Sequence, residues 1–459
     1  MLNALRNFGL AISRFTGEWV PDSWIICLIL TGLSMLLAIL GVGVSLEDAV
    51  LAWGGGVWVL LELAMQFTLA LIAANACVSA RPVHRFLDRL AGLPDPEHPA
   101  QAIALAAAIA VLVGYLNWAV SVVGCALFAT FIARRNPKVD VRVLAVTTIL
   151  GMGTVWHGGF SGSAPLIMAT PGNPLIDPST GAAVVDRLYP VTETLLHPFN
   201  LVYMALIGSA GVLAAVAVHP KRDPVTFSEA HIEAILPRLP EEEPLGGASI
   251  ARLESSRLWI WFAAALLAYP LGHALVTRGF GATWTINAYN TAFLALALLL
   301  HGRPQSFLAA CREGVGPAWG IILQFPFYAG IFGLMQGTGL GAWMGELFAR
   351  VATQGSYPII VFLYSGLVNL FVPSAGSKWL IEAPYLIPAA EQLDVSVTTV
   401  LLAYAYGDSS TNLIQPLIAI PVLAVLRIRF GEIAGYGAMI MAICLAVSLV
   451  AMWLIPSNL

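Results

Sequence analysis

The sequence predicts an all-α polytopic membrane protein made of two inverted repeats, each with a re-entrant hairpin and a broken transmembrane helix. Composition indicates the membrane, because 58% of the 459 residues are hydrophobic, 10% are charged, and the mean hydropathy is +0.82. Four residues recur at equal spacing in the second half and indicate the repeats: Gly114, Asn117, Val120 and Gly124, then Gly366, Asn369, Val372 and Gly376. Gln66-Phe67 recurs similarly, as Gln324-Phe325.

The chain is expected to begin with an amphipathic helix at 1–22 on the membrane surface, because apolar residues recur there at helical spacing among Asn7, Arg14 and Glu18. A full membrane span needs about 20 apolar residues. Stretches of about this length predict spanning helices at 23–43, 57–79, 199–219, 258–277, 315–336 and 433–456, and a shorter one lies at 287–301.

Two further apolar stretches in each half are interrupted by polar residues and glycines. Those at 102–133 and 358–390 predict re-entrant hairpins, and those at 141–175 and 397–426 predict spanning helices with an unwound middle. Lipid cannot satisfy the backbone groups that such breaks leave free, so the breaks have to face protein or a water-filled cavity. Matching breaks in two halves are typical of the substrate site of a secondary transporter.

Positive charge predicts the orientation in the membrane. With a cytoplasmic N-terminus and a hairpin at 102–133, most of the 22 Lys and Arg residues lie in cytoplasmic segments. If 102–133 were a simple span, the basic segment after it would face outside. The span at 258–277 then reverses the second half, so that 23–219 and 278–459 become inverted repeats joined by a cytoplasmic linker at 220–257.

Several classes of function lack support in the sequence. The five cysteines are scattered singly, which indicates neither disulfides nor a metal site, and no basic block suggests nucleic acid. An intramembrane hydrolase would need a motif such as HExxH or GxSxG, and neither is present, although His157 and Ser161 lie close in sequence. A carrier without a cofactor is therefore expected, not an enzyme.

Oxygen-bearing side chains at the breaks form a candidate cation site. They are Asn117, Ser121, Ser161, Ser163, Asn369, Ser374 and Asn412. Such oxygens suit a hard cation, and the alternative is that they only satisfy the broken helix ends. Asp408 and His157 could instead carry a proton. The sequence leaves both Na⁺ and H⁺ open as coupling ions.

Lys378, directly after the second hairpin break, suggests an anionic substrate. A lysine within the membrane costs about 2.5–3.5 kcal/mol unless it is solvated or paired. A substrate carboxylate could pair with it, and the alternatives are Glu382, one turn along, and Asp408. The full candidate substrate site is Lys378, Ser374, Ser377, Trp118, Trp379, Ser161, Thr411, Asp408 and His157.

Longer motifs surround these residues: HGGFSGSAP at 157–165, TPGNP at 170–174, QFPFYAG at 324–330, VPSAGSKW at 372–379, IPAA at 387–390 and AYG at 405–407. They resemble the bacterial short-chain fatty acid transporter family of the ion transporter superfamily. The resemblance implies transport of acetoacetate, butyrate or a related monocarboxylate across the inner membrane. It also implies a homodimer with a scaffold and a moving, elevator-like transport domain.

Two departures concern the candidate site. The family pattern has Gly-Gly-Gly-His-Trp where this chain has Ala375-Gly-Ser-Lys-Trp379, and it often has Gly at the position of His157. A permanently charged lysine could change the preferred size or charge of the substrate. A dicarboxylate transporter or a cation/proton antiporter of the same superfamily therefore stays as the alternative.

Overall fold

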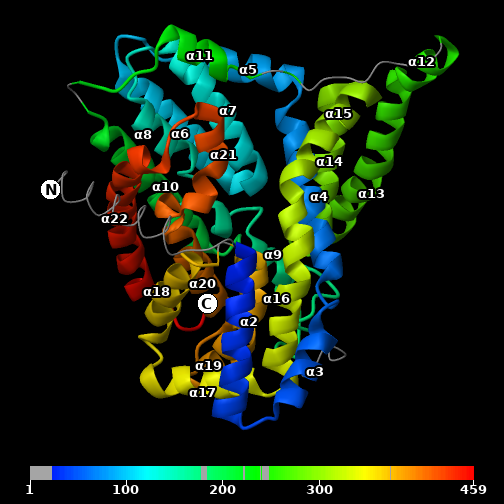
Figure 1. The fold of residues 1–459 in the computed structure, drawn as a ribbon, viewed down its shortest axis with the longest axis vertical. Coiled ribbons are helices and arrows are strands. Elements are labelled where there is room, and N and C mark those ends of the chain that lie inside the picture. Colours follow the sequence, from blue (N-terminus) through cyan, green and yellow to red (C-terminus); the bar gives the residue numbers. More distant parts are fainter. Residues whose placement is uncertain (1–22, 177–182, 221–222, 238, 240–247, 373) are drawn as a thin grey trace.

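The computed structural model describes residues 23–176, 183–220, 223–237, 239, 248–372 and 374–459. Within these residues every regular element is a helix (Figure 1). In the part of the chain that the structure describes, eight helices are long and apolar enough to cross a membrane, judged by length and composition. The prediction of an all-α polytopic protein is confirmed. The expected amphipathic helix at 1–22 lies outside the described residues.

The described part of the first half opens with a series of helices. They are α2 (Ser23–Leu37), the π-helix η1 (Ala38–Val42), α3 (Leu46–Gly56), α4 (Leu61–Val78) and α5 (Arg81–Ala91). The stretches expected to span at 23–43 and 57–79 correspond to α2 with η1 and to α4. Ser45 caps α3 by accepting a hydrogen bond from the Asp48 amide.

The stretch expected to form the first hairpin consists of α6 (Pro99–Leu116) and α7 (Trp118–Arg135), which pack against each other. A single residue, Asn117, separates them. Its backbone is extended, and its side chain accepts a hydrogen bond from the Val120 amide, which caps α7. The polar break that the sequence marked is therefore a sharp turn between two helices.

The first interrupted span consists of α8 (Val141–Thr148), the 3₁₀ turn η2 (Trp156–Gly158) and α9 (Ser163–Ala169), and α10 (Pro198–Val218) follows. Buried Asp140 caps α8 through the amides of Arg142 and Val143, and also accepts a hydrogen bond from the Val225 amide. Asp140 thus fastens the start of the linker to the start of α8.

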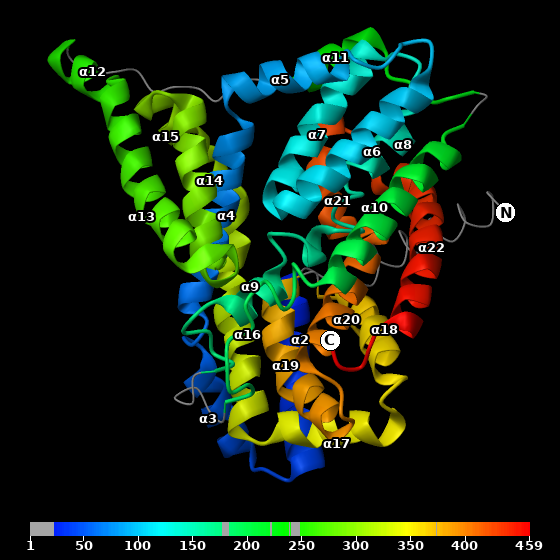
Figure 2. The ribbon, with the colours of Figure 1, turned by 180° about the vertical axis from the view of Figure 1, so that it is seen from behind.

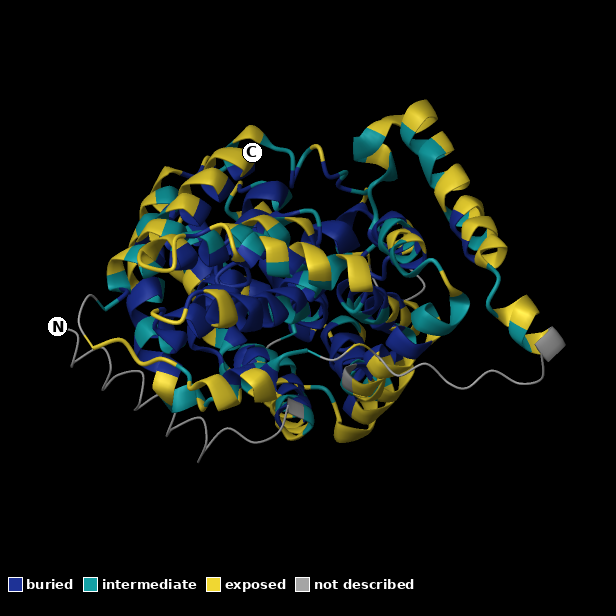
Figure 3. Ribbon diagram, turned by 90° about the horizontal axis from the view of Figure 1, so that it is seen from above, coloured by how far each residue is buried: buried dark blue, intermediate teal, exposed yellow. Residues whose placement is uncertain are grey.

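The middle of the chain holds α11 (Glu229–Ile235), α12 (Ala248–Glu254), α13 (Arg257–Thr283), α14 (Ile286–His301), α15 (Pro304–Val315), η4 (Gly316–Ala318), α16 (Trp319–Gly337) and α17 (Leu340–Val351). α13 is longer than the expected 258–277 and includes a kink at Gly279, whose φ is 78°. Buried residues gather in the body of the molecule (Figure 3), whereas α13 is largely exposed.

The last third contains the second pair of interrupted elements. It comprises α18 (Tyr357–Asn369), α19 (Ala375–Gln392), α20 (Val397–Ser410), η5 (Asn412–Ile414), α21 (Pro416–Leu426) and α22 (Phe430–Leu454). α18 and α19 occupy the stretch expected to form the second hairpin. The second interrupted span bends by 43° between η5 and α21.

The recurring glycines of the two hairpins have a packing reason. A Cβ atom on Gly114 would lie 2.7 Å from the Cα of Gly151, and one on Gly366 would lie 3.0 Å from the carbonyl oxygen of Gly407. In each half, the first arm of the hairpin thus touches the interrupted span of the same half. Only glycine allows so close an approach without displacing the neighbour.

The second arms of the hairpins cross over to the other half. α7 packs against α4 and α21, whereas α19 packs against α16 and α9 (Figures 1 and 2). Each hairpin therefore touches the second part of the interrupted span that belongs to the other half. This exchange brings the four breaks together, while the inversion of the two repeats in the membrane stays a prediction.

Candidate functional site

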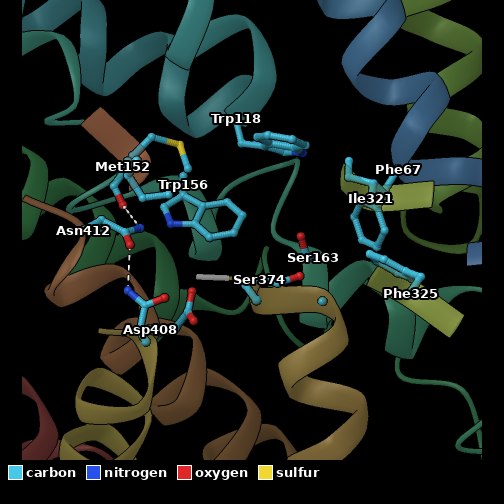
Figure 4. Close-up of a pocket in the computed structure, with 14 residues that line it drawn as sticks. Phe67, Trp118, Met152, Trp156, Ser163, Ile321, Phe325, Ser374, Asp408 and Asn412 are labelled. Atoms are coloured by element: carbon cyan, nitrogen blue, oxygen red, sulfur yellow. Dashed lines mark hydrogen bonds between the residues drawn. The ribbon is translucent and has the colours of Figure 1, made fainter. Parts of the chain in front are cut away.

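Residues from all four breaks line one cavity of about 190 Å³ (Figure 4). The lining residues from the breaks are Trp118, Met152, Trp156, Ser163, Asn369, Ser374, Ala375, Gly376, Asp408, Asn412 and Ile418, and the others are Phe67, Ile321 and Phe325. Trp118, Ser163, Asn369, Ser374, Asp408 and Asn412 were expected at the site from the sequence. The cavity thus lies where the interrupted elements meet.

One wall of the cavity is apolar and comes from unbroken helices. Phe67 on α4 and Phe325 on α16 lie with their ring centroids 5.9 Å apart, beside Ile321. The start of α19 lies directly against this wall, since a Cβ atom on Gly376 would be 2.9 Å from the Phe67 ring. This contact leaves no room for a side chain at Gly376.

The opposite wall is held together by amide side chains. The Asn369 side chain donates to Asn412 Oδ1 at 2.7 Å and to Thr411 Oγ1 at 3.0 Å. Asn412 in turn donates to the carbonyl oxygen of Met152 at 2.9 Å (Figure 4). Thr411 also donates to the carbonyl of Gly366, so it supports the wall without lining the cavity. These bonds tie the interrupted spans of both halves to the second hairpin.

Three residues of the expected cation site lie behind the cavity. Ser161 Oγ accepts a hydrogen bond from the Trp118 amide at 2.8 Å, and Asn117 caps α7. Ser121 is fully buried, with its Oγ 4.0 Å from the sulfur of Cys125. Asn117, Ser121 and Ser161 therefore support the first hairpin tip, whereas Ser163, Asn369, Ser374 and Asn412 line the cavity.

Two serine hydroxyl groups, those of Ser374 and Ser377, lie at the start of α19. Ser377 is fully buried and donates to Ser374 Oγ at 2.6 Å. Trp379 is also fully buried and packs on the Tyr404 ring, with centroids 4.7 Å apart. Trp379 does not line the cavity. The tryptophans that do line it are Trp118, which the sequence predicted at the site, and Trp156, which it did not.

Lys378 is paired within the protein. Its Nζ lies 2.6 Å from Asp408 Oδ1 and donates to the carbonyl of Ser365 at 2.9 Å. The side chain is almost completely buried and does not line the cavity, whereas Asp408 does. Of the three partners weighed from the sequence, the structure shows Asp408. A direct contact of Lys378 with a ligand in the cavity is not part of this arrangement.

His157 lies beside this buried ion pair, behind the cavity. Its Nδ1 lies 3.1 Å from Asp408 Oδ2, and its Nε2 accepts a hydrogen bond from the Ala164 amide at the start of α9. Since Nε2 is an acceptor, the ring proton belongs on Nδ1, and the imidazole is neutral. His157 therefore caps α9 from a buried position beside Asp408, where its ring is stacked on Trp156.

A family comparison decides the identity of the chain. Residues 4–455 match the model of the family described as "Short chain fatty acid transporter". The chain belongs to the short-chain fatty acid transporter family. Two relatives whose names also refer to short-chain fatty acid transport are found in Escherichia coli (strain K12) and Haemophilus influenzae. They are 34% and 30% identical, and each alignment covers 93% of this chain and 94% of the relative.

Solved structures show that this short-chain fatty acid transporter family member shares its fold with other transporters. The YdaH transporter of Alcanivorax borkumensis matches with a TM-score of 0.57 and 16% identity, over 95% of this chain and 98% of that one. MtrF of Neisseria gonorrhoeae matches with a TM-score of 0.56 and 13% identity, over 96% and 97%. At such low identity these matches concern the fold alone.

Proposed function

We propose that this member of the short-chain fatty acid transporter family is a secondary active transporter. It moves short-chain fatty acids or related small monocarboxylates across the bacterial inner membrane, with its N-terminus in the cytoplasm. The cavity at the junction of the four breaks carries this proposal. Pockets for drug-sized ligands measure about 300–1,000 Å³, so a cavity of about 190 Å³ suits a smaller molecule.

The two sides of the cavity suit the two ends of a short fatty acid. The carboxylate would face the Ser163 and Ser374 hydroxyls and the first turn of α19, where backbone amides and the helix dipole favour an anion. The acyl chain would lie against Phe67, Phe325 and the ring of Trp118. Lys378, behind Asp408, offsets the negative charge of that lining carboxylate.

The lining of the cavity favours a monocarboxylate over a dicarboxylate. Among the described residues that line it, none is Lys or Arg, and Asp408 carries the one ionisable side chain. A second carboxylate would need a further cationic partner. A binding experiment that includes dicarboxylates and cations can identify a dicarboxylate transporter or a cation/proton antiporter instead.

We further propose alternating access by an elevator-type motion within a homodimer. In this scheme α4 and α16 belong to the scaffold, and the two hairpins with the two interrupted spans form the moving domain. Support comes from the cavity itself, which lies between the apolar wall of α4 and α16 and the broken elements. The coupling ion would be Na⁺, held by the oxygens of residues such as Asn369, Ser374 and Asn412, or H⁺.

The test is a calorimetric titration of the purified protein with mono- and dicarboxylates of two to six carbons, in Na⁺ and then in K⁺. We expect butyrate or acetoacetate to bind and longer or doubly charged acids to bind at least about tenfold more weakly, a difference of about 1.4 kcal/mol. Preferential binding of dicarboxylates, or of cations without any carboxylate, would support the alternatives.

A matched pair of variants ties the binding to this cavity. Gly376→Ala places a methyl group against Phe67 and is expected to abolish or strongly weaken carboxylate binding. Gly355→Ala is the control, because a Cβ atom at that exposed position meets nothing within 4 Å. Equal binding by both variants would move the substrate site away from this cavity.

A further inference from the structure

Glu382 is a buried carboxylate that the proposed substrate site does not use. It lies in α19, is 2% exposed, and its Oε2 has no hydrogen-bond partner within the described residues. The nearest basic residue on the helix, Lys378, lies one turn earlier and is committed to Asp408 and Ser365. Glu382 is therefore an acid without a dedicated counter-charge.

The charges around Glu382 do not balance when both acids are ionised. Lys378, one helical turn from Glu382 on α19, and Asp408, 2.6 Å from Lys378, are the charged groups that act on Glu382. His157, on the far side of Asp408, is neutral because its Nε2 accepts the Ala164 amide. Two carboxylates thus share one ammonium group, which leaves one negative charge in excess.

The neighbouring helices supply no compensating charge. Tyr364, Tyr385 and Tyr404 lie within electrostatic range, but their phenols are neutral: Tyr364 and Tyr385 bond to each other at 2.8 Å, and Tyr404 donates to the Ala375 carbonyl. α9, α16 and α18 contain no charged residue. On α17, Glu346 and Arg350 are exposed and pair with each other.

We propose that Glu382 is the proton-binding site through which this transporter couples carboxylate movement to H⁺. A buried charge without a partner is relieved most directly by taking up a proton. The Glu382 carboxylate accepts one H⁺ from water on the loading side, becomes a neutral carboxylic acid, and returns that H⁺ on the other side. No other bond forms or breaks.

The proton and the substrate would favour each other's binding, and this coupling rests on the proposed function. Asp408 lines the cavity and is paired with Lys378, one helical turn from Glu382, so the charges of Asp408 and Glu382 act on each other. With Glu382 neutral, Lys378 and Asp408 cancel, and an anion enters a cavity without excess negative charge. With Glu382 ionised, the anion meets one uncompensated negative charge. Linkage requires that each ligand strengthen the binding of the other by the same factor.

The experiment is a calorimetric titration of the full-length protein with butyrate, in two buffers of different ionisation enthalpy and from about pH 6 to about pH 9, a range that includes known values for buried Glu. For the wild type we expect net proton uptake on binding. We also expect affinity to fall by up to about tenfold per pH unit on the alkaline side, the limit for one linked proton.

Three variants identify the residue responsible. Glu382→Gln should bind butyrate without proton uptake and with affinity that changes less than about twofold across the range, since no linked proton remains. Glu391→Gln, an exposed acid on the same helix, should behave like the wild type. Glu382→Asp keeps a titratable group and should keep the proton uptake.

The unfavourable outcomes are distinct. Proton uptake by Glu382→Gln equal to that of the wild type would overturn the proton site and leave the transporter proposal intact. Equal loss of butyrate binding in Glu382→Gln and Glu382→Asp would assign Glu382 a packing role. Failure of the wild type to bind any small carboxylate would overturn the proposed function, and the coupling with it.

Discussion

The pairing of Lys378 with Asp408 predicts a large and specific stability effect. Lys378→Met removes the ammonium group and leaves Asp408 buried without its 2.6 Å partner. Removing one partner of a buried ion pair costs about 3–5 kcal/mol, whereas replacing both partners by neutral groups of similar volume is often close to neutral. We therefore expect Lys378→Met to destabilise strongly and Lys378→Met with Asp408→Asn to recover most of the loss.

The measurement is equilibrium unfolding in detergent micelles, followed by tryptophan fluorescence, for the wild type, both single variants and the double variant. The four free energies of unfolding give the interaction energy of the pair, which we expect at about 3 kcal/mol. Lys138→Met is the control, since Lys138 is exposed and its loss should change stability by less than about 0.5 kcal/mol. Strictly additive effects of the two single variants would refute the pairing.

Three further predictions concern the rest of the chain. Burial raises the pKa of Asp140, but hydrogen bonds from Arg142 and from the Val225 and Val143 amides outweigh it, so the pKa lies below its usual value. The stability that ionised Asp140 provides is present in full above the unfolded-state pKa of about 3.9 and is lost as pH falls through the folded-state pKa. Asp140→Asn should therefore flatten the acidic part of a curve of melting temperature against pH. An unchanged curve would contradict the assignment. Gly114→Ala forces a methyl group within 2.7 Å of Gly151 and should lower stability by about 1–3 kcal/mol, measured by chemical unfolding, whereas Gly54→Ala, with open space around the added carbon, should not. In a cysteine-free background, single cysteines at exposed Lys138 and Gly355 should react with an impermeant maleimide from opposite sides of the membrane, and labelling from the same side would reject the inverted topology.

The sequence located the breaks because their residues violate the pattern of a spanning helix. Asn117 and Asn369 stand out in apolar surroundings, and the glycines that recur beside them mark positions of close packing. These signals placed Ser163, Ser374, Asp408 and Asn412 at the site, and all four line the cavity. Local chemistry was sufficient for this part of the prediction.

The apolar wall was hidden for the opposite reason. Phe67, Ile321 and Phe325 are ordinary residues for a spanning helix, so composition gives no reason to select them. The recurrence of Phe67 as Phe325 was the one available signal. The sequence left three partners open for Lys378 and could not choose among them, because Asp408 is distant in sequence and only the packing of α19 against α20 brings the two together.

The crossing of the hairpins has a consequence for how this protein can vary. Since α7 rests on α21 and α19 rests on α9, each half of the chain supplies the surface that supports a hairpin of the other. A substitution that changes the packing surface of α9 should therefore displace the tip of α19, in the opposite half, more directly than it displaces the hairpin of the first half. The two halves have to co-adapt, so a chimaera that takes one half from a distant relative should lose its cavity even when both parental proteins fold.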